Sequence, residues 1–136
     1  MKTAEQHVEA FRVAGVEART SNTREMSGQG VIGPLWRRLE KPSGKMVIAV
    51  YCDYQGNRDG EYTYVLGVKA SEGKRQVAAG RYAVLTFKGA VTPEAVVDLW
   101  KQIWALEDAH AIRRSYRTDF EVHGENHLEL YVGVES

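Results

Sequence analysis

The chain has 136 residues, of which 43% are hydrophobic, 10% aromatic and 26% charged. This composition is typical of a folded domain and excludes a disordered chain, which would have too few apolar and aromatic residues to form a core. Eighteen Lys and Arg residues balance eighteen Asp and Glu residues, so the formal net charge is zero. Because domains that bind nucleic acid usually carry an excess of basic residues, we expect no direct contact with nucleic acid.

Targeting signals and cysteine usage indicate a cytoplasmic location. Cys52 is the only cysteine, which excludes an internal disulfide and fits a reducing compartment. The first residues lack the apolar stretch of a secretion signal, and no run approaches the roughly 18 apolar residues that span a bilayer. We therefore expect a cytoplasmic protein without membrane contact, folded as a single domain over residues 1–136.

Short motifs recur along the chain at a spacing of about 65 residues, which indicates an internal duplication. The matching pairs are Val13-Ala14-Gly15 with Ala78-Ala79-Gly80, Leu35-Trp36 with Leu99-Trp100, and Tyr64-Val65-Leu66-Gly67-Val68 with Tyr131-Val132-Gly133-Val134. We expect two repeats, over about residues 7–70 and 75–135, each with a strand, a helix and two further strands.

In the first repeat, Gly15 interrupts a strand pattern, and such a glycine often marks a bulge or a close backbone approach. Asn22 followed by Glu25 resembles a capping box and predicts the start of a helix. We expect this helix to break or kink near Gly33-Pro34. Two strands, over residues 46–54 and 61–70, then flank a turn-rich connection.

In the second repeat, apolar residues on both parities of segment 82–87 predict a central strand. Thr92 and Pro93 suit the N-cap and first position of a helix, whose apolar residues then recur at three- and four-residue spacing. A hairpin follows, with strands over residues 114–123 and 127–134. The predicted fold class is α+β, with about eight mostly antiparallel strands, two helices, and a seam between the repeats where a concave site is expected.

The last hairpin shows a clear alternation of apolar and acidic residues. Phe120, Val122, Leu128, Leu130 and Val132 share one parity, whereas Asp119, Glu121, Glu129 and Tyr131 share the other. We expect one hydrophobic face and an opposite face on which acids lie beside an aromatic ring.

Few residues suit catalysis or metal binding. The chain has no glycine-rich phosphate loop and no nucleophile elbow, and the apolar surroundings of Cys52 predict a packing role. Zinc sites need three or four ligands, so we interpret His123 and His127 as exposed turn residues and expect no metal or cofactor. Because the net charge is zero, we interpret the arginines at 113, 114 and 117 as solvated surface residues.

The aromatic residues are the strongest functional signal. Seven tyrosines against three phenylalanines is an unusual choice for a purely apolar core, since each buried hydroxyl needs a partner. Glu121 lies either at the floor of an aromatic box, where it would select a cationic guest, or on the surface near Arg117. The residues that we expect to bind a ligand are Glu121, Trp36, Tyr51, Tyr64, Tyr82, Trp100, Trp104, Tyr116 and Tyr131.

Ordered motifs along nearly the whole chain resemble the GyrI-like effector-binding domain, and among its branches the freestanding integron cassette-encoded proteins. They include Phe11-Arg12-Val13-Ala14-Gly15, Arg19-Thr20-Ser21-Asn22, Gly60-Glu61-Tyr62, Ala79-Gly80-Arg81-Tyr82, Ser115-Tyr116 and Asp119-Phe120-Glu121. The resemblance implies two strand–helix–strand–strand modules and a pocket for cationic or amphipathic aromatic compounds. It also implies that Glu121 is the acidic residue of that pocket.

The same resemblance leaves several functions open. Relatives sense drugs in transcription activators, but this sequence has no segment for a helix-turn-helix, so regulation would act through a protein partner. Other relatives inhibit gyrase, which makes gyrase a second possible partner. Still others resemble hydrolases that open cyclopropane rings, and an enzyme of this kind would use Glu121 as its general acid or base. We expect a binding protein rather than an enzyme.

Overall fold

The computed structural model describes residues 4–39 and 46–135 and shows an α+β fold, as predicted. Within these residues, one antiparallel sheet has the strand order β1-β6-β8-β7-β3-β4-β2-β5. The strands are β1 (Ala4–Val8), β2 (Phe11–Ser21), β3 (Val47–Cys52), β4 (Glu61–Lys69), β5 (Arg75–Val77), β6 (Gly80–Lys88), β7 (Arg114–Gly124) and β8 (His127–Val134). The helices are α1 (Asn22–Met26), α2 (Ile32–Arg38) and α3 (Pro93–Asp108), one more than predicted.

The strand order is symmetric about its central pair, β7 and β3. If β1 to β4 are exchanged with β5 to β8, strand by strand, the result is the same order read from the opposite edge of the sheet. A duplicated unit would produce this order, and the two repeats stay a prediction. The central strands β3 and β7 pair with each other, so a seam between the two predicted repeats would run between them.

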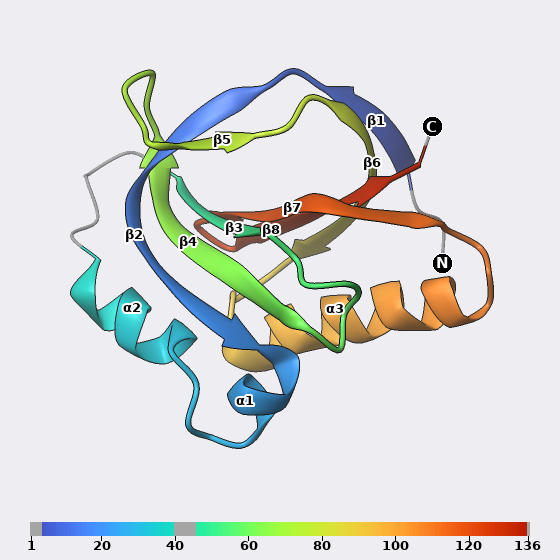
Figure 1. Cartoon of the computed structure of the whole chain (residues 1–136), viewed down its shortest axis with the longest axis horizontal. Helices are drawn as coiled ribbons and strands as arrows, with labels where there is room; N and C mark the ends of the chain where they lie inside the picture. The colour runs from blue at the N-terminus through green and yellow to red at the C-terminus, as the bar shows by residue number, and fades with distance from the viewer. Residues whose placement is uncertain (1–3, 40–45, 136) are drawn as a thin grey trace.

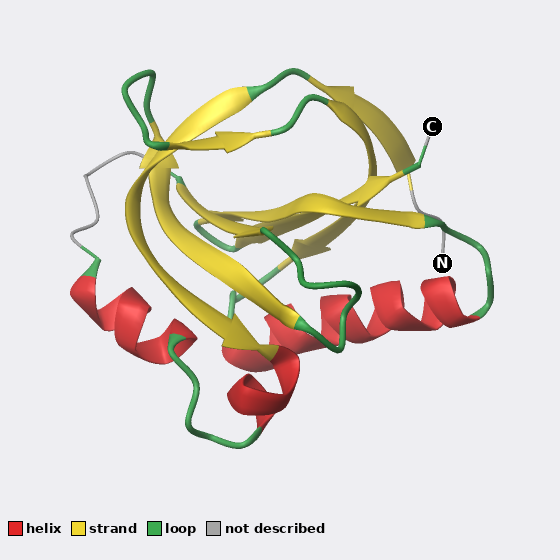
Figure 2. Ribbon diagram, in the orientation of Figure 1, coloured by secondary structure: helices red, strands yellow, loops and turns green. Residues whose placement is uncertain are grey.

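The sheet curls strongly, with the helices on one side of it and strands β1 and β5 arching over the other (Figures 1 and 2). Alternate residues therefore supply two separate cores. Tyr51, Tyr64 and Leu130 belong to the core on the helix side, whereas Val50, Tyr82 and Phe120 belong to the core under the arch. Cys52 packs in the second core, as predicted, and burial raises the pKa of its thiol to about 11.

The first helical region differs from the prediction. Ser21, rather than Asn22, is the N-cap of α1, and its side chain accepts a hydrogen bond from the Arg24 amide. Glu25 does not complete a capping box, because its carboxylate instead accepts from the amides of Val31 and Ile32 at the start of α2. The interruption therefore lies between Met26 and Ile32.

Gly33 and Pro34 do not break a helix, because they lie in the first turn of α2, where a missing amide proton is tolerated. Helix α3 begins as predicted, with Thr92 as N-cap accepting from the Ala95 amide. No helix in the described part of the chain is long and apolar enough to span a membrane.

In the last hairpin, the two faces differ from those predicted. Gly124 pairs with His127, so the two-residue turn places odd residues of β7 opposite even residues of β8. Glu121 therefore lies opposite Leu130 on the helix side, and Phe120 lies opposite Tyr131 under the arch. The acids of β7 do not share a face with Tyr131.

Strands β2 and β4 approach closely where Gly15 pairs with Gly67. A Cβ atom at Gly67 would lie 1.9 Å from the Ala14 carbonyl oxygen, and one at Gly15 would lie 2.0 Å from that of Leu66. Since both clashes involve backbone atoms, neither glycine can be replaced without moving a strand. The predicted close approach at Gly15 is confirmed.

We expect Gly67→Ala to lower the free energy of unfolding by about 2–3 kcal/mol, because the strands must separate to admit the methyl group. Gly33→Ala is the matched control, since its Cβ would be 3.5 Å from the nearest atom, in the Arg37 side chain. Alanine in helix α2 should be neutral or stabilising by roughly 0.5–1 kcal/mol. Denaturant titration measures both, and an unchanged midpoint for Gly67→Ala would contradict the steric account.

Candidate functional site

A cavity of about 730 Å³ lies on the helix side of the sheet. Its walls come from α1 and α2, from α3 as far as Trp104, and from strands β3, β4 and β7. Six of the nine residues predicted as ligand contacts line it, namely Trp36, Tyr51, Tyr64, Trp100, Trp104 and Glu121. The cavity therefore brings aromatic rings from both predicted repeats together with Glu121.

Glu121 is only 1% exposed and lies on β7 at the wall of the cavity. The Tyr51 hydroxyl donates to its Oε2 at 2.6 Å, and the Trp100 indole donates to the same oxygen at 2.7 Å. Both donors are uncharged, so they orient the carboxylate and partly offset its desolvation without neutralising it. The interpretation of Glu121 as an exposed strand acid is wrong.

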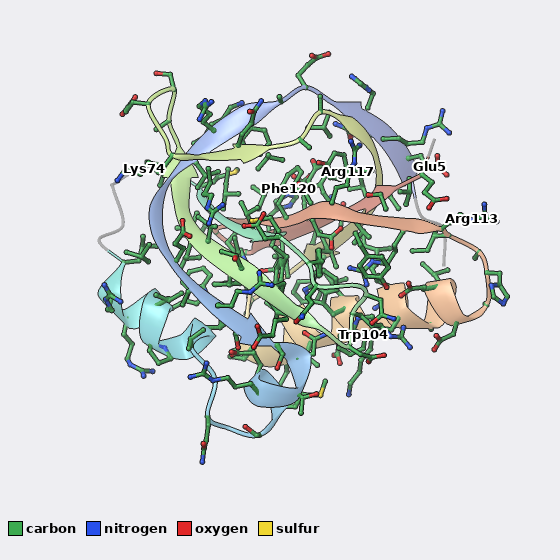
Figure 3. All side chains as sticks on the ribbon, in the orientation of Figure 1. Glu5, Lys74, Trp104, Arg113, Arg117 and Phe120 are labelled. Atoms are coloured by element: carbon green, nitrogen blue, oxygen red, sulfur yellow. The ribbon has the colours of Figure 1, made fainter. Side chains whose placement is uncertain are left out.

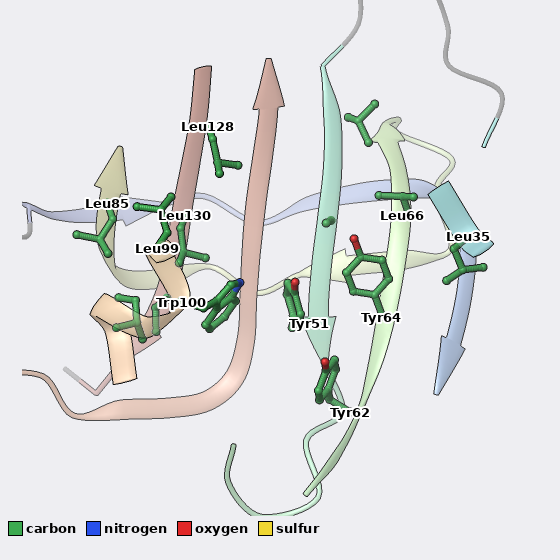
Figure 4. Close-up of a cluster of buried hydrophobic side chains, with 14 residues drawn as sticks. Leu35, Tyr51, Tyr62, Tyr64, Leu66, Leu85, Leu99, Trp100, Leu128 and Leu130 are labelled. Carbon is green, nitrogen blue, oxygen red and sulfur yellow. The ribbon is translucent and has the colours of Figure 1, made fainter. Parts of the chain in front are cut away.

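The rings around Glu121 form a continuous aromatic surface. Tyr51 lies at the centre, with ring centroids 5.1 Å from Tyr64, 5.3 Å from Tyr62 and 4.9 Å from Trp100. Figure 4 shows Tyr51 and the tyrosines of β4 projecting from neighbouring strands, with Trp100 beside Tyr51. Trp36 completes this wall from α2, where its indole donates to the Tyr64 hydroxyl at 3.0 Å. Flat rings fixed in this way suit a planar or cationic guest.

His123 belongs to the cavity rather than to an exposed turn. Its Nε2 lies 2.7 Å from Glu121 Oε1, and its ring lies edge-on to Trp36 at a centroid distance of 4.8 Å. Its side chain is 11% exposed, because β7 extends to Gly124 and carries His123 on the same face as Glu121. The prediction of an exposed histidine at position 123 is therefore wrong.

Arg114 is also buried, contrary to its interpretation as a surface residue. Its Nη2 lies 2.7 Å from Asp119 Oδ2, and both side chains are almost fully enclosed, at 1% and 0% exposure. An irregularity between residues 114 and 119 of β7 shifts the pairing register, which brings both side chains to one face. Burial opposes the charge of Arg114, but Asp119 and the tyrosines at 54 and 116 leave the pKa of its guanidinium above the ordinary value.

The charges that line the cavity are unevenly compensated. Arg114 is paired with Asp119 and Glu107, and Arg58 is paired with Glu107 and Asp108. In the described ranges, Glu121 has no Lys or Arg partner, and its only charged contact is with His123. The negative charge of Glu121 is therefore available to a ligand whenever His123 is neutral.

Three predicted contact residues do not line this cavity. Tyr82 and Tyr131 pack against Phe120 in the core under the arch, where Figure 3 shows Phe120 on the far side of β7 from α3. Tyr116 lies just behind the cavity, where it packs against Tyr54 and donates to a Glu107 carboxylate oxygen. Strand parity separates Tyr82 and Tyr131 from Glu121, and the register shift in β7 displaces Tyr116.

Other residues line the cavity without having been predicted as contacts, and they include Tyr54, Tyr62, Glu25, Arg58, Arg114 and His123. Tyr62 could have been found, because it lies two residues from Tyr64 on the same strand and must share its face. Tyr54 lies beyond β3 and donates to Asp119, which no sequence pattern indicates.

All seven tyrosines are protected from ionisation. Burial, and next the charge of Glu121, raises the pKa of Tyr51 and Tyr64 well above the usual value, and burial with Asp119 does the same for Tyr54. Burial also raises the pKa of Tyr62, and it raises those of Tyr82, Tyr116 and Tyr131 to about 12. The phenols that surround the acids are therefore neutral donors at physiological pH.

This protection predicts a loss of stability in alkali. Unfolded tyrosines release protons near pH 10, whereas folded ones retain them to about pH 12 or beyond. Above about pH 10 the unfolded state binds fewer protons, so the free energy of unfolding should fall as the pH rises. Absorbance at 295 nm should show little tyrosinate in the folded protein at pH 10.5 and much more in denaturant, and equal signals would contradict the burial of the rings.

Comparisons with known proteins agree with this fold. Residues 6–134 match the family model of integron-associated effector binding proteins. YobU of Bacillus subtilis strain 168, named as a candidate transcriptional regulator, is 30% identical over an alignment that covers 94% of each chain.

Two solved structures share the fold. An integron cassette protein from the mobile metagenome of Vibrio cholerae has a TM-score of 0.85 at 24% identity, covering 98% of this chain and 95% of its own. SAV2435, solved with bound tetraphenylphosphonium, has a TM-score of 0.72 at 15% identity, covering 100% of this chain and 95% of its own. The resemblance found in the sequence is confirmed, and the chain belongs to the integron-associated effector-binding protein family.

Proposed function

We propose that the cavity binds an amphipathic organic cation with aromatic surfaces, and that Glu121 is its counter-ion. The observation that carries this proposal is the burial of Glu121 between neutral donors at the wall of a ring-lined cavity. A buried carboxylate without a cationic partner is costly, so a guest that brings a positive charge gains an ion pair that a neutral guest does not.

The aromatic wall favours the same class of ligand. Tyr51, Tyr64, Trp36 and Trp100 present rings that attract a cation through their quadrupoles and that bury apolar surface. A permanent organic cation is weakly hydrated and loses little on leaving water, whereas a small inorganic ion would lose its hydration shell. SAV2435, which shares the fold, was solved with tetraphenylphosphonium, a cation of this class.

We also propose that ligand binding serves transcriptional regulation through a protein partner. The support is the kinship with YobU, which is named as a candidate transcriptional regulator and matches over nearly its whole length. The balanced net charge of the chain favours a protein partner over direct contact with DNA.

Tetraphenylphosphonium and tetraphenylborate test the charge requirement, because they have almost the same shape and opposite charge. We expect the cation to bind with micromolar affinity, about −8 kcal/mol at 1 μM, and the anion to bind at least about 100-fold more weakly. Glu121→Gln should weaken cation binding about 10- to 100-fold, since it removes the ion pair and keeps the shape of the side chain. Isothermal titration calorimetry measures all four combinations.

Glu129→Gln is the matched control, because Glu129 lies on β8 and is absent from the cavity wall. It should bind both ions as the unmodified protein does. Equal affinity for the two ions, or an unchanged cation affinity in Glu121→Gln, would contradict the proposed role of Glu121.

A further inference from the structure

The cavity contains a second acid, Glu25, at a different place from Glu121. Glu25 comes from α1, whereas Glu121 comes from β7, and both line the same space. Both lining arginines are paired with other acids, and within the described ranges Glu25 forms no salt bridge with Lys or Arg. The cavity therefore has two carboxylates that no arginine or lysine in those ranges compensates.

Glu25 is held firmly in position. Its Oε2 accepts from the Thr20 hydroxyl at 2.5 Å and the Val31 amide at 2.8 Å, and its Oε1 accepts from the Ile32 amide at 3.3 Å. All three donors are uncharged, so they fix the carboxylate without neutralising it. The side chain is half-buried, which strengthens its attraction for a cation relative to a surface acid.

The strand order sets the separation between the two acids. Glu121 lies on β7, and Glu25 is tied to Thr20 on β2, with β3 and β4 between those strands. Three strand spacings of about 4.8 Å give roughly 14 Å across the strands. The register adds an offset along the strands, because Glu121 is level with Val16 of β2 and Thr20 lies further along that strand. At about 3.3 Å per residue this offset is roughly 13 Å, so the two acids are roughly 19 Å apart across a flat sheet.

The floor between the two acids is aromatic. Tyr51 on β3 and Tyr62 and Tyr64 on β4 project from the intervening strands to the face that carries Glu121 (Figure 4). After burial, the charges of both Glu25 and Glu121 raise the pKa of Tyr62 and Tyr64, as expected for rings that lie between two acids.

We propose that the cavity accepts an elongated aromatic dication whose positive ends are about 15–20 Å apart, one at Glu121 and one at Glu25. The aromatic middle of such a ligand lies over the tyrosines of β3 and β4. This proposal rests on the proposed function, since it assigns one end of the ligand to the same Glu121 site.

Glu25 also has a structural role, which the test must separate from ligand binding. Its carboxylate joins α1 to α2, and a Cβ at Gly30 would lie 2.1 Å from its Oε1, so the intervening loop is folded tightly around it. Removing Glu25 by mutation can therefore disturb one wall of the cavity. A disturbed wall would lower the affinity for every ligand. The loss of one ion pair would remove only the gain in affinity that the second positive charge of a dication provides.

The experiment uses bis(4-amidinophenoxy)alkanes of increasing chain length and, for each, the analogue with one amidine replaced by a neutral carboxamide. In the unmodified protein, the dication that spans the two acids should bind at least about 10-fold more tightly than its monocationic analogue. In Glu25→Gln, this ratio should fall to about 1–2 while the affinity for the monocation stays within about threefold. Glu94→Gln, an exposed acid of α3 outside the cavity wall, should keep the full ratio.

Three results would overturn the proposal. They are a dication that binds no better than its analogue at any length, a ratio that survives Glu25→Gln, and an equal loss of both ligands in Glu25→Gln. Failure of the monocation to bind, or its indifference to Glu121→Gln, would instead contradict the proposed function itself.

Discussion

The site depends on one interaction, the fixation of a buried carboxylate by neutral donors. Glu121 is held by Tyr51 and Trp100, whose hydroxyl and indole groups carry no charge. A carboxylate inside a protein is normally paired with a cation, because its burial is otherwise costly. Here the fold provides hydrogen bonds from neutral donors instead of an arginine. The carboxylate of Glu121 can therefore still attract a positively charged ligand. His123 is the nearest cationic group, and its charge is conditional on protonation.

A contrasting acid lies two residues away on the same strand. Asp119 forms a salt bridge with Arg114, which is always charged, and accepts hydrogen bonds from the Tyr54 hydroxyl and the Gly133 amide. Its charge is therefore used within the protein, and Arg114 can line the cavity without neutralising Glu121. The two acids share a face of β7 but have different partners, so Asp119 has a structural role and Glu121 is the one proposed to bind a ligand.

The fold class, the long helix and the ring-lined site could be predicted, because they depend on periodicity and on residue type. Alternation along one strand places Tyr62 with Tyr64, and Glu121 with Asp119. The faces of different strands could not be related in this way, since Gly124 pairs with His127 and reverses the parity between β7 and β8. Tyr131 is therefore predicted at the site although it lies under the arch. Tyr82 is predicted there from the family motif that contains it, and it also lies under the arch.

The positions of charged residues whose partners are distant in the sequence could not be predicted either. Nothing near Arg114 in the sequence shows that a register shift turns it inward, and nothing near Glu25 shows that it joins two helices.

The most direct test of the account is a crystal structure of the protein with tetraphenylphosphonium. The account predicts the phosphorus atom within about 6 Å of the Glu121 carboxylate, with phenyl rings against Tyr51, Tyr64 or Trp100. A cation bound elsewhere, with the space beside Glu121 empty or filled by protein side chains, would contradict it.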